Sequence, residues 1–105
     1  MNTKNDEENL EYLFRAITSI KNVEECRRFF EDLCTVPELN AMSRRLMVAK
    51  LLSENVVYSE IVSRTGTSTA TISRVNRSMN YNGSSGYPII FERLRSEKNK
   101  DEMED

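Results

Sequence analysis

The sequence predicts an all-α protein of about six helices. Only three glycines and two prolines occur among its 105 residues, which favours helices over sheet and turn structure. Apolar residues recur at helical spacing along most of the chain. The stretch from Tyr58 to Asn80, YSEIVSRTGTSTATISRVNRSMN, also has the layout of two short helices joined at a glycine. A chain of this length supports one domain, so we predict a single helical domain over residues 1–105.

The first two helices are predicted from apolar stripes. The first stripe consists of Leu10, Leu13, Phe14, Ile17 and Ile20. Asn22, followed three residues later by Glu25, is typical of a helix start. The helix that it opens is expected to bury Cys26, Phe29, Phe30 and Leu33.

A third helix is predicted to begin after Thr35, because Glu38 stands at the capping offset and Pro37 fits a first turn. Its apolar surface is wide, comprising Leu39, Met42, Leu46, Val48, Ala49, Leu51 and Leu52. A monomer of this length has little material to enclose such a helix, so we expect the first three helices and the last to be shared with a second subunit. The alternative is a compact monomeric bundle.

The stretch from Tyr58 to Asn80 is interpreted as a helix-turn-helix over about 58–80. Ile61, Ile72 and Val75 stand where such a unit buries side chains, and Gly66 stands where the turn needs positive φ. Ser68 is the expected cap of the second helix.

A loop over Tyr81 to Pro88, YNGSSGYP, is expected to lead into a last helix. The apolar residues of that helix are Ile89, Ile90, Phe91 and Leu94. Beyond Ser96 the sequence EKNKDEMED is strongly charged, and we predict a disordered acidic tail over about 97–105.

The net charge of −2 is unevenly distributed. Residues 43–77 hold six basic and two acidic residues, whereas residues 1–42 hold five and nine, and residues 78–105 hold four and six. Positive charge is therefore concentrated around the helix-turn-helix, where DNA phosphates would need neutralising. Ordinary charge scatter on a solvated surface is the alternative.

Several functional classes are disfavoured. The chain has no histidine and no nucleophile, carboxylate pair or metal cluster typical of an active site, so no catalytic residue is predicted. Cys26 and Cys34 lie in one predicted helix, where a disulfide is excluded, and they are expected to be buried thiols rather than zinc ligands. No apolar run suits a membrane span and no signal peptide is evident, so we expect a soluble, cytoplasmic protein without membrane partners.

The start of the second helix of the helix-turn-helix carries short hydroxyl side chains, which bond to base edges and phosphates in DNA. The predicted DNA-binding residues are Thr67, Ser68, Thr69, Ala70, Thr71, Ser73 and Arg77. Hydroxyls also occur at ordinary helix caps, and Arg77 has the alternative of a solvated surface arginine.

The hexapeptide ATISRV, Ala70 to Val75, preceded by TGTST and followed by NRS, closely resembles the reading helix of the Trp repressor family. More narrowly, the chain is similar to the small Trp-repressor-related proteins of Gram-positive bacteria, from about Leu10 to Leu94. This resemblance implies an intertwined homodimer that binds a palindromic operator in double-stranded DNA and represses transcription.

The resemblance also implies an effector site for L-tryptophan or another small molecule. The family's arginines that hold the indole correspond to Arg74 on the reading helix and to Arg44 or Arg45 on the third helix, depending on the direction of alignment. Ser78 matches the serine that helps to hold the ligand. Val75 departs from the family's glycine and fills space beside the ligand, so we expect no tight tryptophan binding and no required cofactor.

The sequence therefore indicates a DNA-binding transcriptional regulator. A helical protein-interaction module with a vestigial helix-turn-helix is the alternative. Salt distinguishes them, because binding through Lys and Arg contacts to phosphates weakens steeply as salt rises.

Overall fold

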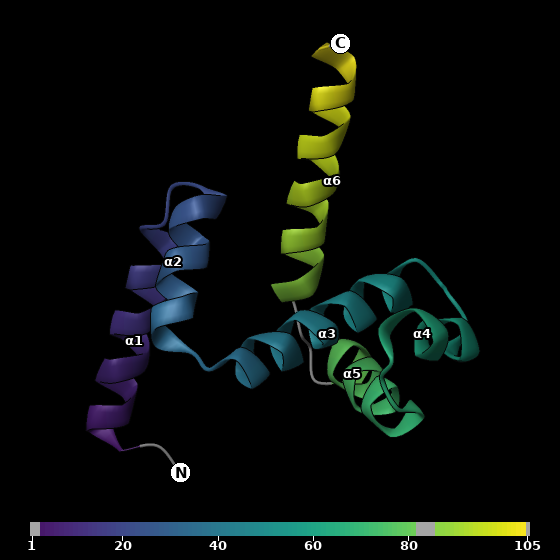
Figure 1. The fold of residues 1–105 in the computed structure, drawn as a ribbon, viewed down its shortest axis with the longest axis horizontal. Helices are drawn as coiled ribbons and strands as arrows, with labels where there is room; N and C mark the ends of the chain where they lie inside the picture. The colour runs from purple at the N-terminus through teal and green to yellow at the C-terminus, as the bar shows by residue number, and fades with distance from the viewer. Residues whose placement is uncertain (1–2, 82–85, 105) are drawn as a thin grey trace. The chain divides into compact units, whose positions relative to one another are not determined.

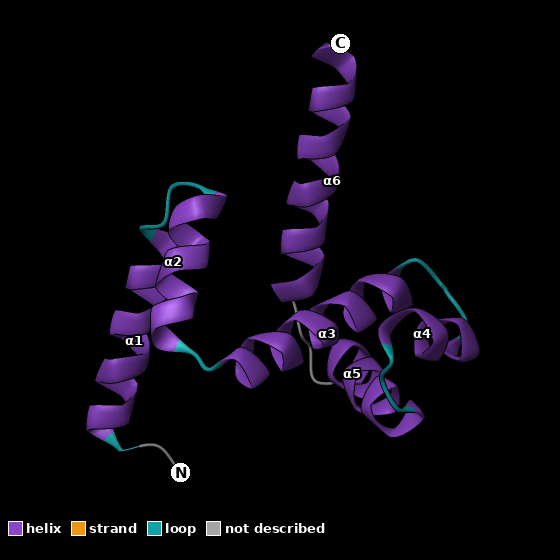
Figure 2. Cartoon of the chain, viewed as in Figure 1, coloured by secondary structure: helices purple, strands orange, loops and turns teal. Residues whose placement is uncertain are grey.

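The computed structural model describes residues 3–81 and 86–104, which form six α-helices and no strand (Figures 1 and 2). The helices are α1 (Lys4–Thr18), α2 (Val23–Leu33), α3 (Val36–Ser53), α4 (Tyr58–Thr65), α5 (Thr69–Tyr81) and α6 (Gly86–Glu104). The predicted all-α class is confirmed. No helix in these ranges has the length and apolar character needed to cross a membrane.

The chain divides into two compact units, Met1–Leu39 and Asn40–Asp105. The first holds α1, α2 and the start of α3, and the second holds the rest. The single domain over residues 1–105 stays a prediction.

Side-chain caps fix the helix starts of the first unit. The Asn22 side chain accepts from the Glu25 amide at 2.8 Å at the start of α2. At the start of α3 the Thr35 amide donates to Glu38 Oε1 at 2.8 Å, and the Glu38 amide donates to Thr35 Oγ1 at 3.2 Å. Both predicted caps are confirmed.

The cap at Glu38 makes this helix start sensitive to pH. The hydrogen bond from the Thr35 amide, and secondly the one from the Thr35 side chain, hold the pKa of Glu38 below its usual 4.5. A carboxyl whose pKa is lowered on folding stabilises the fold above its unfolded pKa, and this stabilisation disappears as pH falls through the folded value. We expect Glu38→Gln to lower the melting temperature at neutral pH and to match the parent protein well below pH 4.5. Thermal unfolding across that range measures this, with Glu31→Gln as the charge-matched control; a difference that persists in acid would contradict it.

The apolar stripes of the first unit remain exposed. None of the described residues of α1 or α2 is buried. Phe14 is 55% exposed and Leu33 is 51% exposed. The prediction that Leu33 is buried is wrong within one chain, and Cys26 and Cys34 are free and only partly buried rather than enclosed. Two short helices have too little surface to enclose these side chains by themselves.

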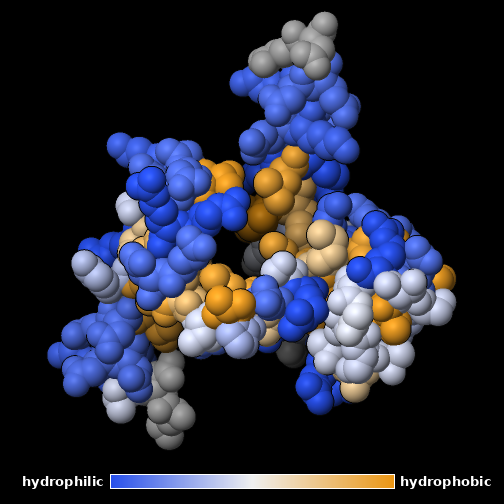
Figure 3. Space-filling model, viewed as in Figure 1, coloured by the Kyte–Doolittle hydropathy of each residue, from blue (hydrophilic) through white to orange (hydrophobic). Residues whose placement is uncertain are grey.

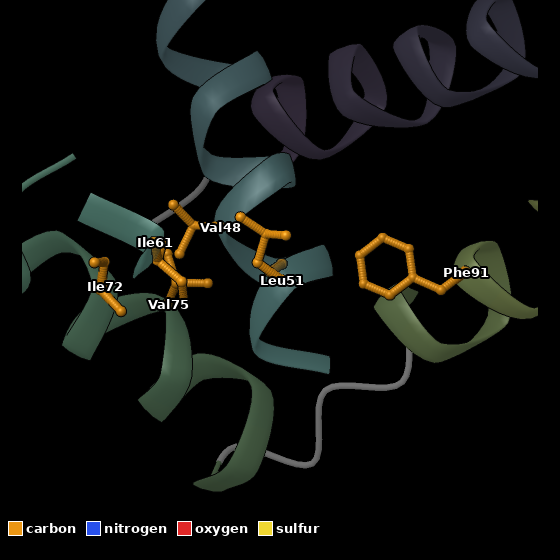
Figure 4. Close-up of a cluster of buried hydrophobic side chains, with 7 residues drawn as sticks. Val48, Leu51, Ile61, Ile72, Val75 and Phe91 are labelled. Atoms are coloured by element: carbon orange, nitrogen blue, oxygen red, sulfur yellow. The ribbon is translucent and has the colours of Figure 1, made fainter. Parts of the chain in front are cut away.

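The core of the second unit joins four helices (Figure 4). Its buried residues are Val48, Ala49 and Leu51 of α3, Ile61 of α4, Ile72 and Val75 of α5, and Phe91 of α6. Ile61 and Ile72 have no exposed surface and Val75 is 5% exposed, so all three predicted core positions of the helix-turn-helix are confirmed. This core fixes α5 against α3 and α4.

The apolar residues of α6 gather in its first half. Phe91 is 6% exposed and its ring stacks on Tyr87 at 5.6 Å between centroids. Figure 3 shows apolar residues near the start of α6 and hydrophilic ones toward its end. The helix continues through Glu104, so the prediction of a disordered tail is wrong for residues 97–104. Lys, Glu and Met favour helix, and no glycine or proline follows Pro88 to end it. The loop predicted over Tyr81 to Pro88 is wrong at both ends, since Tyr81 belongs to α5 and residues 86–88 belong to α6. Residues 82–85 and Asp105 lie outside the described residues.

Candidate nucleic-acid interface

Helices α4 and α5 form the helix-turn-helix predicted over about 58–80. Gly66 ends α4 in the left-handed region, with φ of 69°, and its amide donates to the Val62 carbonyl at 2.9 Å. The predicted positive φ at Gly66 is confirmed. The start of α4 lacks a side-chain cap, because the apolar Val57 stands at the cap position.

Hydroxyl groups hold the turn between the helices. Thr65 Oγ1 donates to the Ile61 carbonyl at 2.7 Å and accepts from the Thr67 amide at 3.2 Å. Ser68 Oγ accepts from the Thr71 amide at 3.2 Å and donates to Thr71 Oγ1 at 3.1 Å. The expected cap at Ser68 is confirmed, and Ser68 and Thr71 use their hydroxyls on each other.

The residues predicted to bind DNA divide between two faces of α5. Thr69, Ser73 and Arg77 are exposed and follow one another at four-residue spacing, so they share one face. We call this set, with the exposed Ala70 beside it, the reading face. Thr67 is only 8% exposed, unlike these residues, and its binding to DNA stays a prediction. Its amide donates to Thr65 Oγ1 at 3.2 Å, which ties it to the end of α4.

Another face of α5 borders a cleft of about 580 Å³. Its walls come from α3, the turn, α5 and α6: Ala41, Arg44, Arg45, Gly66, Thr67, Ser68, Thr71, Arg74, Val75, Ser78 and Tyr87. The four candidate effector residues from the sequence, Arg44, Arg45, Arg74 and Ser78, are therefore brought together. Alignment left open whether Arg44 or Arg45 is the family's arginine. Both line the cleft, so lining the cleft does not distinguish between them.

Sequence reasoning missed two residues of this cleft as partners of the arginines, Tyr87 and Thr67. Tyr87 lies on α6 beyond residues 82–85, and its only signal was helical spacing to Phe91. Val75 both lines the cleft and belongs to the core. Within residues 3–81 and 86–104, no group of three or more His, Cys, Asp or Glu is placed to hold a metal ion.

Comparisons with known proteins agree with this architecture. The model of the Trp repressor protein family matches residues 8–95. The chain is 48% identical over 86 residues to YerC, an uncharacterised protein of Bacillus subtilis, and this match covers 82% of each chain.

Two solved structures are similar along most of their length. A TrpR-like protein from Eubacterium eligens matches with a TM-score of 0.79 and 53% identity, covering 83% of this chain and 89% of the other. A candidate Trp repressor from Staphylococcus aureus matches with a TM-score of 0.80 and 41% identity, covering 90% and 96%.

Proposed function

Because the chain belongs to the Trp repressor family, we propose that it is a sequence-specific DNA-binding transcriptional repressor that reads DNA with α5. The observation that carries this proposal is the reading face. Thr69, Ser73 and Arg77 are exposed on a helix that the fully buried Ile72 anchors in the core. A rigid helix with short polar side chains near its start suits insertion into the major groove. Arg77, one turn beyond Ser73, suits a phosphate contact.

The repressor acts as a homodimer on a palindromic operator. Exposed apolar side chains support this assembly: Leu10, Phe14, Leu33, Met42, Leu46, Met47, Ile89, Ile90 and Leu94 are each 39–55% exposed. Apolar surface on this scale is typical of an interface rather than of solvent-facing helices. A two-fold dimer presents two reading faces to two half-sites.

Charge supports DNA as the partner. Arg44, Arg45, Arg64, Arg74 and Arg77 lie in the helix-turn-helix and the adjoining part of α3, and all five are exposed. Within the described residues none of them forms an ion pair with a carboxylate. Their charge is therefore available to DNA phosphates. The relatives come from bacteria, whose chromosome lies in the cytoplasm, and we propose that this protein acts there.

Operator binding does not require L-tryptophan. Val75 is 5% exposed and packs in the core while it lines the cleft, so we expect it to leave less room for an indole beside Arg74 than the family's glycine would. Overpacking of this kind costs about 1–3 kcal/mol, enough to lower affinity by roughly tenfold or more.

The test is selection of bound duplexes from a random pool by the purified protein, with and without L-tryptophan. We expect the same palindrome in both conditions. Enrichment only with tryptophan would contradict the effector-independent mechanism, and no enrichment at low salt would favour a protein-interaction module.

Variants of the reading face, put through the same selection, test whether this face binds DNA. Thr69→Ala and Ser73→Ala should relax the preferred sequence without loss of helix content, because they remove base contacts but no buried group. Arg77→Ala should weaken binding to every duplex and reduce the slope of log affinity against log salt by about 0.9 for the lost phosphate contact. Arg93→Ala, an exposed arginine of α6, is the charge-matched control. Unchanged binding by all three variants would exclude the reading face.

A further inference from the structure

The cleft beside α5 has the composition of an anion site. Arg44 and Arg45 reach it from α3 and Arg74 from α5. No acidic side chain is among its described lining residues, and none of these three guanidinium groups is paired in the described part of the chain. Three positive charges held together without a counter-charge repel one another and favour binding of an anion.

A second observation points to a missing hydrogen-bond partner. Thr67 lines the cleft, its side chain is 8% exposed, and its Oγ1 is buried without a hydrogen-bond partner among the described residues. A buried hydroxyl without a partner costs about 1–3 kcal/mol. Ser78 and Tyr87 add hydroxyl groups to the same walls. Donors therefore outnumber acceptors, as is required around an oxyanion.

The cleft lies along a face of α5 that adjoins the reading face. Thr71, Arg74 and Ser78 follow one face of α5 at three- and four-residue spacing. Ser73 lies two residues from Thr71, which places it about 200° around the helix axis. Arg74 lies four residues after Ala70 and three before Arg77, so a ligand in the cleft borders the reading face without covering Ser73.

We propose that this cleft binds the phosphate group of a small phosphorylated molecule. Guanidinium groups bind phosphate through paired N–H donors, and a phosphate accepts more hydrogen bonds than a carboxylate does. The start of α5 adds the partial positive charge of a helix N-terminus near Ser68. A phosphate of the DNA backbone has the same chemistry and is the other source to be tested. The inference concerns the regulation of the proposed DNA-binding protein and rests on that function.

Titration of the full-length protein with inorganic phosphate, and then with phenyl phosphate, tests the site at constant ionic strength. We expect saturable heat in calorimetry and a rise in melting temperature. L-tryptophan and acetate serve as carboxylate probes and should bind more weakly. No saturation by either phosphate, or tighter binding of L-tryptophan, would overturn the proposal.

Substitutions in the cleft define the site. Arg44→Ala and Arg74→Ala should each weaken phosphate binding about tenfold or more, because each removes charge-assisted hydrogen bonds. Arg64→Ala is the matched control, since Arg64 is exposed on α4 and does not line the cleft. Equal losses in all three variants would show a nonspecific charge effect and overturn the site.

Thr67→Val provides an independent variant, because it removes the unpartnered hydroxyl while keeping the side chain's shape. It should weaken phosphate binding about three- to tenfold without lowering the melting temperature of the ligand-free protein. Unchanged phosphate affinity would contradict the role of Thr67.

DNA binding in phosphate-free buffer distinguishes the two sources. If the ligand is a small molecule, Arg44→Ala and Arg74→Ala lower duplex affinity no more than Arg64→Ala does. If the cleft holds a backbone phosphate, both variants lower it further and free phosphate competes with DNA, which overturns the small-molecule source. Phosphate binding without any DNA binding would contradict the proposed function but support the phosphate site. DNA binding without phosphate binding would support the proposed function but overturn the phosphate site.

Discussion

Replacing Ile72 with alanine is expected to lower the free energy of unfolding by about 2–5 kcal/mol and to abolish operator binding. Ile72 has no exposed surface and lies in the core between α5 and α4 (Figure 4). Its truncation removes buried apolar surface and leaves a cavity that the surrounding helices close only in part. A large share of the stability of a small domain is lost, since such domains are stable by about 5–15 kcal/mol in total.

The measurement is urea unfolding followed by circular dichroism, at one fixed protein concentration. Ile72→Val is the graded control and should cost about 0.5–1.5 kcal/mol. Thr69→Ala, three residues earlier on the exposed face, should change stability by less than about 0.5 kcal/mol. Equal stability of the Ile72→Ala and Thr69→Ala proteins would mean that α5 is not anchored through its buried face.

Local rules predict the helix-turn-helix well. The left-handed conformation at Gly66, the cap at Ser68 and the burial of Ile61 and Ile72 follow from residue type and spacing within about four residues. The caps at Asn22 and at Thr35 are predictable for the same reason. Such features depend on the backbone next to each residue and not on the rest of the fold.

Features set by distant contacts were not predictable. Thr67 looks like one more hydroxyl at a helix start, and only the packing of the turn buries it. Tyr87 enters the cleft from α6, through a contact that no local pattern specifies. The charged composition of residues 97–104 indicated disorder, yet helix propensity extends α6 through them. The exposure of Leu33 was not predictable either. An apolar side chain indicates burial, but it does not tell whether the same chain or a second chain buries it.

Introducing a charge into the exposed apolar surface is expected to separate the proposed dimer. Ile90 is 44% exposed on α6 and Phe14 is 55% exposed on α1, although both are strongly apolar. If a second copy covers them, Ile90→Glu and Phe14→Glu each bury an unpaired carboxylate, which costs several kcal/mol. Sedimentation of the variants at micromolar concentration should then give a monomer. Their α1 and α2 helices should also lose helix signal, since neither helix buries a described side chain within one chain.

The effect on DNA should be larger than that of any single reading-face variant. A monomer engages one half-site, and loss of the linked second half-site lowers affinity by about 10²–10⁴-fold. Asn99→Glu adds the same charge to an exposed polar position of α6 and should leave both assembly and operator affinity unchanged. A parent protein that sediments as a monomer would remove the basis of the palindromic operator. If the variants remain dimeric and bind normally, the dimer interface does not include Phe14 or Ile90. The exposed apolar residues of α1 and α6 would then have another role.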